Sequence, residues 1–426
     1  MTQKEKVCVV TLGCVKNVVD SEKLIGNLES QGFSITEEPN NTDVLIINTC
    51  GFIQSAIDEN TDYIKLASKL KLAGKIKKLF VVGCFSERYK DEFQEKFPIV
   101  DNFYGTIYHQ QLVNDLTSKK TELIGERHLL TPKHYAYLKI QDGCEHKCAF
   151  CSIPSFKGGF KSEPIDLLVS ETDALAQNGV KELIVIAQDT TAYGVDFEGK
   201  TKLLPELLDK ISQNEKLKWI RLMYAYPRNF PMKILDLMNE RKNIANYIDI
   251  PIQHISDEVL KKMGRGITTK QTIKLLETIR SKVDNVAIRT TLIVGFPGET
   301  DKNFDELLNF VKDFQFDRLG VFEYSLEKGT PGFKFGDPIP QKVKNERFNE
   351  IMLAQQKISK KKNLELIGKE VEVIIDEKRG TKYIGRTEKD APEIDNTVII
   401  YKRNLEIGKF YKFKITSASE YDLFVK

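Results

Sequence analysis

Gly143-Cys144-Glu145-His146-Lys147-Cys148-Ala149-Phe150-Cys151 places three cysteines within eight residues. The segment follows an apolar stretch, 136–141, that has the composition of a buried strand. Cysteine thiolates are the usual ligands of iron–sulfur clusters and of structural zinc. A zinc site would need a fourth ligand, and no second cysteine pair follows. Three thiolates leave one iron of a four-iron cluster open, so we expect Cys144, Cys148 and Cys151 to hold such a cluster.

Apolar stretches recur at regular intervals after the cysteine loop. Candidate strands lie at 136–141, 183–188, 219–225, 247–251, 286–294 and 318–324, with helical spacing between them, for example at 164–178 and 270–282. Six βα units predict a parallel (β/α) barrel, full or partial, with its site at the carboxyl ends of the strands. The cysteine loop follows the first of these strands, so it is expected at that face.

The first third of the chain predicts a separate open parallel α/β sheet. Its strands are expected at 7–12, 44–48 and 79–83, with helices at 21–31 and 55–72. A cysteine follows each strand within two residues: Cys14, Cys50 and Cys84. Because the carboxyl ends of parallel strands share one edge, these three cysteines are expected to converge as a second metal site. A buried structural residue is the alternative for any single cysteine, and it is our interpretation of Cys8, inside the first strand.

The rest of the chain predicts a linker, a helix and a small all-β domain. Residues 116–134 are charged and weakly periodic, which indicates a linker, and 341–366 has the spacing of a connecting helix. Short alternating strands are expected at 369–376, 396–401, 410–417 and the C-terminus, plausibly as a barrel. The expected domains are 1–132, 133–362 and 363–426.

Composition argues against several classes of partner. There are 64 basic and 61 acidic residues, and residues 363–426 carry 12 of each, so no strongly basic domain is expected to grip RNA. This balance favours a protein substrate. No apolar run approaches the ~20 residues of a membrane span, and no signal peptide is evident, so we expect a cytoplasmic protein with no membrane partner.

Five further residues at strand ends or within strands are candidate ligands of a small molecule. Gln188 and Asp189 end one barrel strand and Gln253 follows another, where polar groups are suited to binding. A turn-capping role is the alternative for Asp189. Arg289 and Thr291 lie in the mostly apolar strand 288–295, where a charge needs a partner. A bound carboxylate is the expected partner of Arg289.

The cysteine loop, including Phe150 before its last cysteine, resembles the cluster motif of the radical S-adenosylmethionine (SAM) superfamily. In that superfamily a [4Fe-4S] cluster passes an electron to SAM and releases a 5′-deoxyadenosyl radical. The resemblance implies that Phe150, Gln188, Asp189, Gln253, Arg289 and Thr291 contact SAM. Cys14, Cys50 and Cys84 resemble the three cysteines with which methylthiotransferases hold a second [4Fe-4S] cluster, and the C-terminal domain occupies the place of that family's TRAM domain.

Methylthiotransferases of two branches remain as alternatives. The MiaB type acts on an adenosine of tRNA, and the RimO type acts on the β-carbon of an aspartate in small-subunit ribosomal protein twelve. Several strings resemble the second type, namely 48–53, 153–158, 188–194, 221–227, 247–254 and 320–325. The sequence departs from the family pattern at Lys157 and Glu163, where arginine is expected.

The resemblance to the RimO type implies two [4Fe-4S] clusters, with SAM as both radical source and methyl donor. It also implies a reducing electron donor, and the ribosomal protein as substrate, either free or in the assembled subunit. A non-enzymatic iron–sulfur carrier or an RNA-binding module is the alternative from another class. A carrier would not need a six-unit barrel, and an RNA-binding module should present a basic face.

Overall fold

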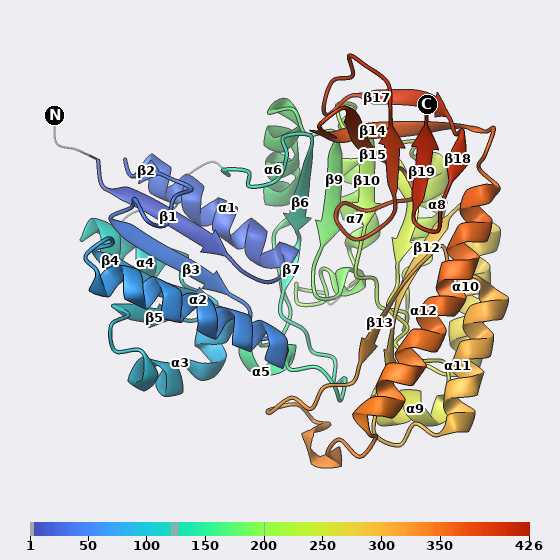
Figure 1. The fold of residues 1–426 in the computed structure, drawn as a ribbon, viewed down its shortest axis with the longest axis horizontal. Coiled ribbons are helices and arrows are strands. Elements are labelled where there is room, and N and C mark those ends of the chain that lie inside the picture. Colours follow the sequence, from blue (N-terminus) through green and yellow to red (C-terminus); the bar gives the residue numbers. More distant parts are fainter. Residues whose placement is uncertain (1–3, 121–122, 124–126, 200) are drawn as a thin grey trace.

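The computed structural model describes residues 4–120, 123, 127–199 and 201–426. An N-terminal α/β domain lies beside a central barrel domain, and a small β domain packs on one end of the barrel (Figure 1). Helix α12 (Gln341–Leu364) runs along the barrel and leads into the β domain. In the described ranges, no helix has both the length and the apolar character needed to cross a membrane.

The N-terminal domain is a five-stranded parallel sheet in the order β2-β1-β3-β4-β5. Its long strands are β1 (Lys6–Thr11), β3 (Val44–Thr49) and β4 (Lys78–Gly83), as the apolar runs predict, and the short β2 (Ser34–Ile35) and β5 (Asn102–Tyr104) flank them. Helices α1 (Val15–Ser30) and α4 (His109–Thr117) pack on one face, and α2 (Gln54–Leu72) and α3 (Cys84–Lys96) on the other. Cys8 is buried in the core beneath α2 and α3.

The central domain is a six-stranded parallel sheet in which each strand pairs with its neighbour in the chain. The strands are β6 (Tyr135–Lys139), β9 (Glu182–Ile186), β10 (Trp219–Leu222), β11 (Ile244–Asp249), β12 (Ala287–Val294) and β13 (Arg318–Glu323). The first and last strands, β6 and β13, do not pair with each other, so the barrel is partial, one of the two forms that the sequence predicts.

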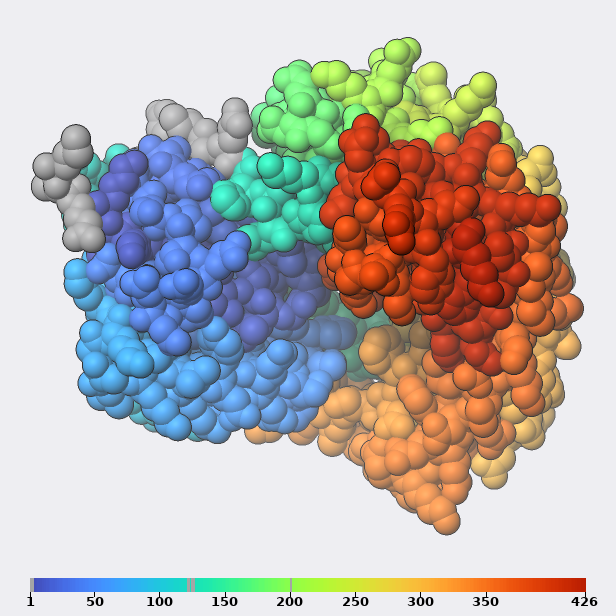
Figure 2. Space-filling view, turned by 45° about the horizontal axis from the view of Figure 1, so that its top comes forward, coloured from blue at the N-terminus to red at the C-terminus, as the bar shows by residue number. Residues whose placement is uncertain are grey.

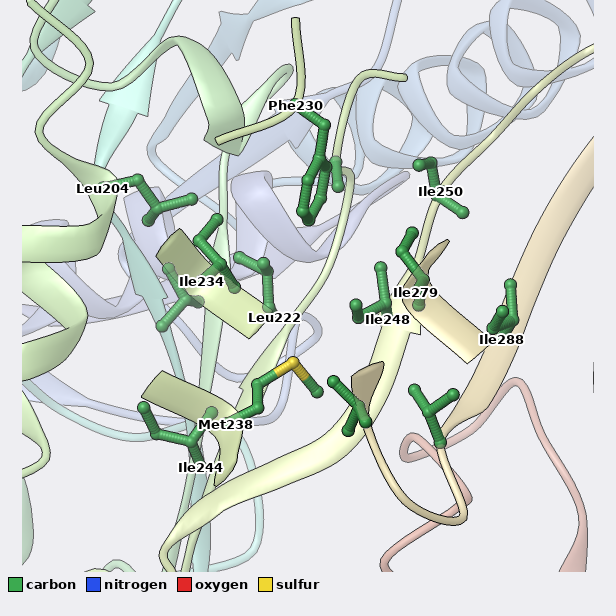
Figure 3. Packing of buried hydrophobic residues seen from close by; sticks show 14 of the residues in the cluster. Leu204, Leu222, Phe230, Ile234, Met238, Ile244, Ile248, Ile250, Ile279 and Ile288 are labelled. Atoms are coloured by element: carbon green, nitrogen blue, oxygen red, sulfur yellow. The ribbon is translucent and has the colours of Figure 1, made fainter. Parts of the chain in front are cut away.

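Helices cover the outer face of this sheet: α6 (Ile165–Gln177), α7 (Leu204–Ile211), α8 (Lys233–Glu240), α10 (Thr269–Lys282) and α11 (Asp301–Phe314). Aliphatic side chains from strands and helices interlock there, for example Ile248 and Ile288 with Ile279 (Figure 3). The short α5 (Ile153–Lys157) and α9 (Asp257–Lys262) lie in loops, and β7 (Gln141–Asp142) pairs with β8 (Lys161–Ser162) around the cysteine loop. Successive side chains of a strand point to opposite faces. Because one face of each strand is buried under these helices, the alternate residues point to the inner face of the barrel.

The inner face of the barrel is filled by parts of the two other domains. Val15 and Val19 of α1 pack against Tyr137, Ile186 and neighbouring inner-face residues. Ala391 of the C-terminal domain joins the same apolar cluster. The apolar cluster on this side of the partial barrel is therefore completed by both neighbouring domains.

The C-terminal domain is a small all-β domain, as predicted, and its strands form one curled sheet. It contains β14 (Glu370–Arg379), β15 (Lys382–Thr387), β16 (Thr397–Ile400), β17 (Phe410–Lys414), β18 (Ser417–Ala418) and β19 (Asp422–Val425). The pairing order is β17-β14-β15-β16-β19-β18. Residues 388–395, between β15 and β16, form a loop with four acidic side chains, which we call the acidic loop.

The acidic loop packs against the inner face of the barrel and binds arginines there. Arg221 donates to the carbonyl oxygen of Glu388 at 2.7 Å. Arg318 pairs with Asp390, and Arg289 lies 3.4 Å from Asp395. Buried cations need such partners, so this loop is an electrostatic part of the barrel.

The acidic loop also corrects our expectation about the surface of the β domain. Basic and acidic residues are equal in number there, but several acidic ones are used internally. The exposed basic residues are Lys369, Lys378, Arg379, Lys382, Lys402, Arg403, Lys409, Lys412, Lys414 and Lys426, against Glu365, Glu370, Glu393 and Glu406. The outward surface is thus more basic than the composition indicates.

The structure describes only part of the predicted linker at 116–134. Residues 121–122 and 124–126 lie outside the described residues, and Leu116 belongs to α4. The described end is firmly held, because Arg127 pairs with Glu22 and Glu171 and His134 binds Asp376 at 2.8 Å. This part of the connection contacts all three domains.

Candidate active site

The structure brings Cys14, Cys50 and Cys84 together at the carboxyl edge of the N-terminal sheet. Gly13 has φ 92°, and a Cβ at this position would lie 2.3 Å from Cys50 Cβ, so only glycine allows the two loops to approach this closely. Burial raises the pKa of Cys50 to about 11 and that of Cys84 to about 12. The neighbouring cysteines contribute to raising both pKa values. Such thiols need a cation to become thiolates, which a bound metal would supply.

Cys144, Cys148 and Cys151 lie in a tightly held loop at the carboxyl end of β6. Gly143, with φ 73°, permits close contact with the 158–159 turn, since a Cβ there would be 2.0 Å from Gly159 O. The Ala149 amide donates to Met263 O at 2.8 Å, and Ala149 O accepts from the Gly332 amide at 2.7 Å. Burial raises the pKa of Cys144 to about 12 and of Cys151 to about 11. The backbone thus fixes the loop before any ligand binds.

Cys148 is surrounded by side chains that sequence reasoning did not single out. Arg265 Nη1 donates to Cys148 Sγ at 3.4 Å, and the Tyr226 hydroxyl lies 3.7 Å from the same sulfur. The Tyr226 ring stacks on His146 with 3.8 Å between centroids, and His146 Nε2 lies 2.7 Å from Asp189 Oδ2. Donors to a cysteine sulfur stabilise its anionic form, as expected for a cluster ligand. Tyr226 lies within the string 221–227, which assigned it no role, and Arg265 lies outside every string that the sequence analysis used.

The two sets of cysteines lie on loops that contact each other. The Ser152 hydroxyl, next to Cys151, donates to the carbonyl oxygen of Phe52, two residues after Cys50, at 3.3 Å. Arg88 of α3 donates to Gly51 O at 2.6 Å and lies 3.5 Å from Glu327, a residue after β13. We call the region between the two sets of thiols the inter-cysteine region. The surface is hollowed between the N-terminal and C-terminal domains (Figure 2).

A buried charge cluster borders the inter-cysteine region. Lys139 at the end of β6 pairs with Asp20 of α1 and with Asp142, and Lys157 lies 3.1 Å from Asp142. Gln188 donates to Asp142 at 3.1 Å. Lys157, which departs from the family pattern, therefore keeps a cationic role at that position. The cluster ties the N-terminal domain to the barrel by charge.

The predicted SAM contacts are distributed around the carboxyl face. Gln188 Oε1 and Gln253 Oε1 are buried without a hydrogen-bond partner, as is the hydroxyl of Tyr324 after β13. Asp189 caps the turn after β9 by accepting from the Thr191 amide at 2.8 Å, in addition to its contact with His146. Phe150 packs on the apolar cluster around Met263 and Phe296. Unpaired buried acceptors fit a polar ligand such as the ammonium group of SAM.

The structure gives Arg289 internal carboxylate partners that the sequence analysis did not foresee. Arg289 donates to Asp249 at 2.9 Å and pairs with Asp395, so its charge is compensated inside the protein and needs no external carboxylate. Thr291 Oγ1 lies 3.4 Å from the same guanidinium group. An acidic loop more than a hundred residues away in sequence supplies the second partner, which no strand pattern indicates.

The donor set fits iron–sulfur clusters. Within the described part of the chain, no three His, Cys, Asp or Glu side chains are arranged around a single ion. In a [4Fe-4S] cluster each thiolate binds a different iron, so the ligands surround a cube rather than one ion. Two sets of three thiols, of which four are buried and one, Cys148, has hydrogen-bond donors, match this requirement.

Comparisons with known proteins agree with this architecture. Family models described as uncharacterized protein family UPF0004, radical SAM superfamily and TRAM domain match residues 6–105, 138–311 and 367–426. Proteins named ribosomal protein uS12 methylthiotransferase RimO from Christiangramia forsetii and Flavobacterium johnsoniae are 48% and 47% identical to this chain. The alignments cover 99% of this chain in both cases, and 94% and 98% of the relatives.

Among solved structures, the radical SAM methyltransferase TsrM from Kitasatospora setae, with cobalamin and a [4Fe-4S] cluster bound, has a similar fold. The TM-score is 0.57 at 14% identity, over 78% of this chain and 77% of that one. The barrel with its cysteine loop defines this protein as a radical SAM enzyme, of a class that uses SAM and a [4Fe-4S] cluster. With relatives of this identity over its whole length, the chain belongs to the RimO family of radical SAM methylthiotransferases.

Proposed function

We propose that this protein inserts a methylthio group at the β-carbon of an aspartate in ribosomal protein uS12, in the cytoplasm. Relatives over the full length carry the name of the uS12 enzyme, which supports the substrate. The observation that carries the chemistry is the direct contact between the two cysteine loops, through Ser152 and Phe52. A reaction that joins a carbon radical to a sulfur needs both sources close together.

Each set of three cysteines is proposed to hold its own [4Fe-4S] cluster, so that the protein carries two. When bound, the cluster at Cys144, Cys148 and Cys151 supplies an electron for cleaving SAM, and the one at Cys14, Cys50 and Cys84 supplies the site of sulfur transfer. The protein positions these groups through the rigid loops, and buried side chains exclude water. Gln188, Gln253, Asp189, Phe150 and Thr291 are proposed to line the SAM site. An external reductant, and uS12 free or within the ribosomal subunit, complete the proposed set of partners.

Mass spectrometry of cells that lack the gene tests this function. We expect uS12 to lose the mass of one methylthio group, while tRNA modification stays unchanged. Restoring the gene should restore the mass. Loss of a methylthio group from tRNA, with uS12 unchanged, would instead support the MiaB-type reaction.

Gly13→Ala is expected to prevent assembly of the N-terminal cluster alone. A Cβ at this position would meet Cys50 at 2.3 Å and push the Cys14 and Cys50 loops apart. Iron in the anaerobically reconstituted protein should fall from about eight to about four atoms per chain. Gly32→Ala is the matched control, because Gly32 has φ 91° and nothing within 4 Å of a Cβ there. Equal iron in the wild type and Gly13→Ala would contradict the prediction.

A further inference from the structure

The proposed substrate brings a negative charge into the inter-cysteine region. The β-carbon of an aspartate is bonded directly to its carboxyl carbon, so the carboxylate must enter together with the reacting atom. A carboxylate removed from water is costly unless it meets a cation or several hydrogen-bond donors. If the proposed function holds, a cation near the two cysteine loops should lack an internal carboxylate partner.

Most cations around this region already have partners. Lys139 and Lys157 are paired with Asp20 and Asp142, and Arg289 with Asp249 and Asp395. Arg88 is paired with Glu327, and Arg265 donates to Cys148 Sγ and to Pro251 O. These side chains hold the domains and the cysteine loops together. The two lysines, Arg88 and Arg289 would each have to break an ion pair to receive an incoming anion. Among the described residues Arg265 has no carboxylate partner and its Nε has no hydrogen-bond partner, but its two terminal nitrogens are held by Cys148 and Pro251.

Lys16 is different. It lies in the first turn of α1, two residues after Cys14, and its Nζ is 3.3 Å from the centroid of the Tyr224 ring. Among the residues that the structure describes, no carboxylate lies within ion-pair distance of this ammonium group. A cation over an aromatic ring is held less strongly than a cation in a desolvated ion pair. Lys16 is thus a half-buried cation with a weak partner.

Tyr224 is held in an unusual conformation that presents its ring to Lys16. It follows β10 at the carboxyl face and has φ 57°, a left-handed conformation that is costly for a bulky residue. Its amide donates to Asp249 Oδ2 at 3.0 Å, and its carbonyl accepts from the Thr190 amide at 3.1 Å. These two bonds maintain the strained backbone. Strain of this kind commonly marks a functional position.

Both residues border the inter-cysteine region from opposite sides. Lys16 comes from the N-terminal domain beside Cys14. Tyr224 comes from the barrel, where Thr190 connects it to Asp189 and so to His146 of the second cysteine loop. A ligand that reaches both sets of cysteines would pass this pair.

We propose that Lys16 is a specificity-determining residue that receives the carboxylate of the substrate aspartate. In the absence of substrate its ammonium group rests on the Tyr224 ring, and the incoming carboxylate replaces this contact by a charge-assisted hydrogen bond. Asparagine has nearly the same shape but no charge, so it cannot make the exchange. A neutral nucleic-acid base is rejected for the same reason.

Binding measurements with the reconstituted holoenzyme test this role. The probes are recombinant uS12 and its variant with the modified aspartate changed to asparagine, at the position identified by mass spectrometry of the wild-type product. The wild-type enzyme should bind the aspartate form at least about tenfold more tightly. Lys16→Met should bind both forms with the same weak affinity. Lys23→Met is the matched control on the same helix, because Lys23 pairs with Glu171 at 3.1 Å, and it should keep the wild-type ratio.

Three results would overturn the proposal. The first is a Lys16→Met variant that keeps the preference for aspartate at wild-type affinity. The second is a variant that loses affinity by the same factor for both probes and so keeps the wild-type ratio. The third is a variant that loses iron and the visible absorption of the clusters. The last result would assign Lys16 to cluster assembly. If the wild-type enzyme neither binds nor modifies uS12, the proposed function itself fails, and the role of Lys16 fails with it.

Discussion

Replacing Cys144, Cys148 and Cys151 together by alanine is expected to abolish reductive cleavage of SAM and to leave about four iron atoms per chain instead of about eight. These cysteines lie in a loop fixed by backbone hydrogen bonds to Met263 and Gly332, so the fold around them should persist without metal. Iron analysis and 5′-deoxyadenosine release with dithionite as reductant measure the two effects. Methylthio transfer to uS12 should vanish with them.

Cys8→Ala is the control for this experiment. Cys8 is more deeply buried than the loop cysteines, and it lies in the core beneath α2 and α3, away from both sets. Its loss should cost some stability and leave iron content and SAM cleavage at wild-type values. Residual SAM cleavage in the triple alanine variant would show that other residues hold the reducing cluster.

Glu182→Gln is expected to destabilise the protein by about 3–5 kcal/mol, because it leaves the buried guanidinium group of Arg221 without a counter-charge and takes one of two carboxylate partners from Arg386. Glu182 is fully buried at the start of β9 and pairs with Arg221 of the barrel at 2.7 Å and with Arg386 of the β domain at 2.8 Å. Trp219, the one tryptophan of the chain, packs edge-on against Phe410 of β17 at 4.8 Å between centroids. Its fluorescence during urea unfolding therefore reports directly on this domain contact.

Glu372→Gln provides the matched comparison at the rim of the same contact. Glu372 pairs with Lys218 at 3.3 Å, but both side chains are partly exposed. Removing this charge should cost at most about 1 kcal/mol. Equal losses of unfolding free energy in the two variants would contradict a special role for the buried group of Glu182, Arg221 and Arg386.

The buried pairs also predict how stability depends on pH. Burial alone would raise the pKa of Glu182, but Arg386 and Arg221 outweigh it and hold that pKa below the ordinary value of 4.5. A carboxyl group with a lowered folded-state pKa stabilises fully above the unfolded-state pKa and progressively less as the pH falls below it. Unfolding free energy should therefore decline below about pH 4.5, less steeply in Glu182→Gln than in the wild type.

Local patterns predicted much of the fold and the main features of the candidate site. Apolar runs gave all six barrel strands, and cysteines at three strand ends gave their convergence, because strand direction in a parallel sheet determines which ends meet. The roles of Arg265 and Tyr226 were not predictable, since they depend on loops that return to Cys148 from distant positions. The second partner of Arg289, Asp395, was not predictable for a similar reason, because it comes from another domain.

The acidic loop has a consequence for how this chain can be divided. A small β domain at a C-terminus suggests a module that could be removed or exchanged. Truncation after α12 would instead remove one partner each from Arg221 and Arg289 and the carboxylate partner of Arg318. It would also uncover Tyr247, whose hydroxyl donates to Asp395 at 2.7 Å. The sequence boundary near residue 363 is thus not a boundary of independent folding. If this domain were moved to another protein, that protein would also need arginines equivalent to these three barrel residues.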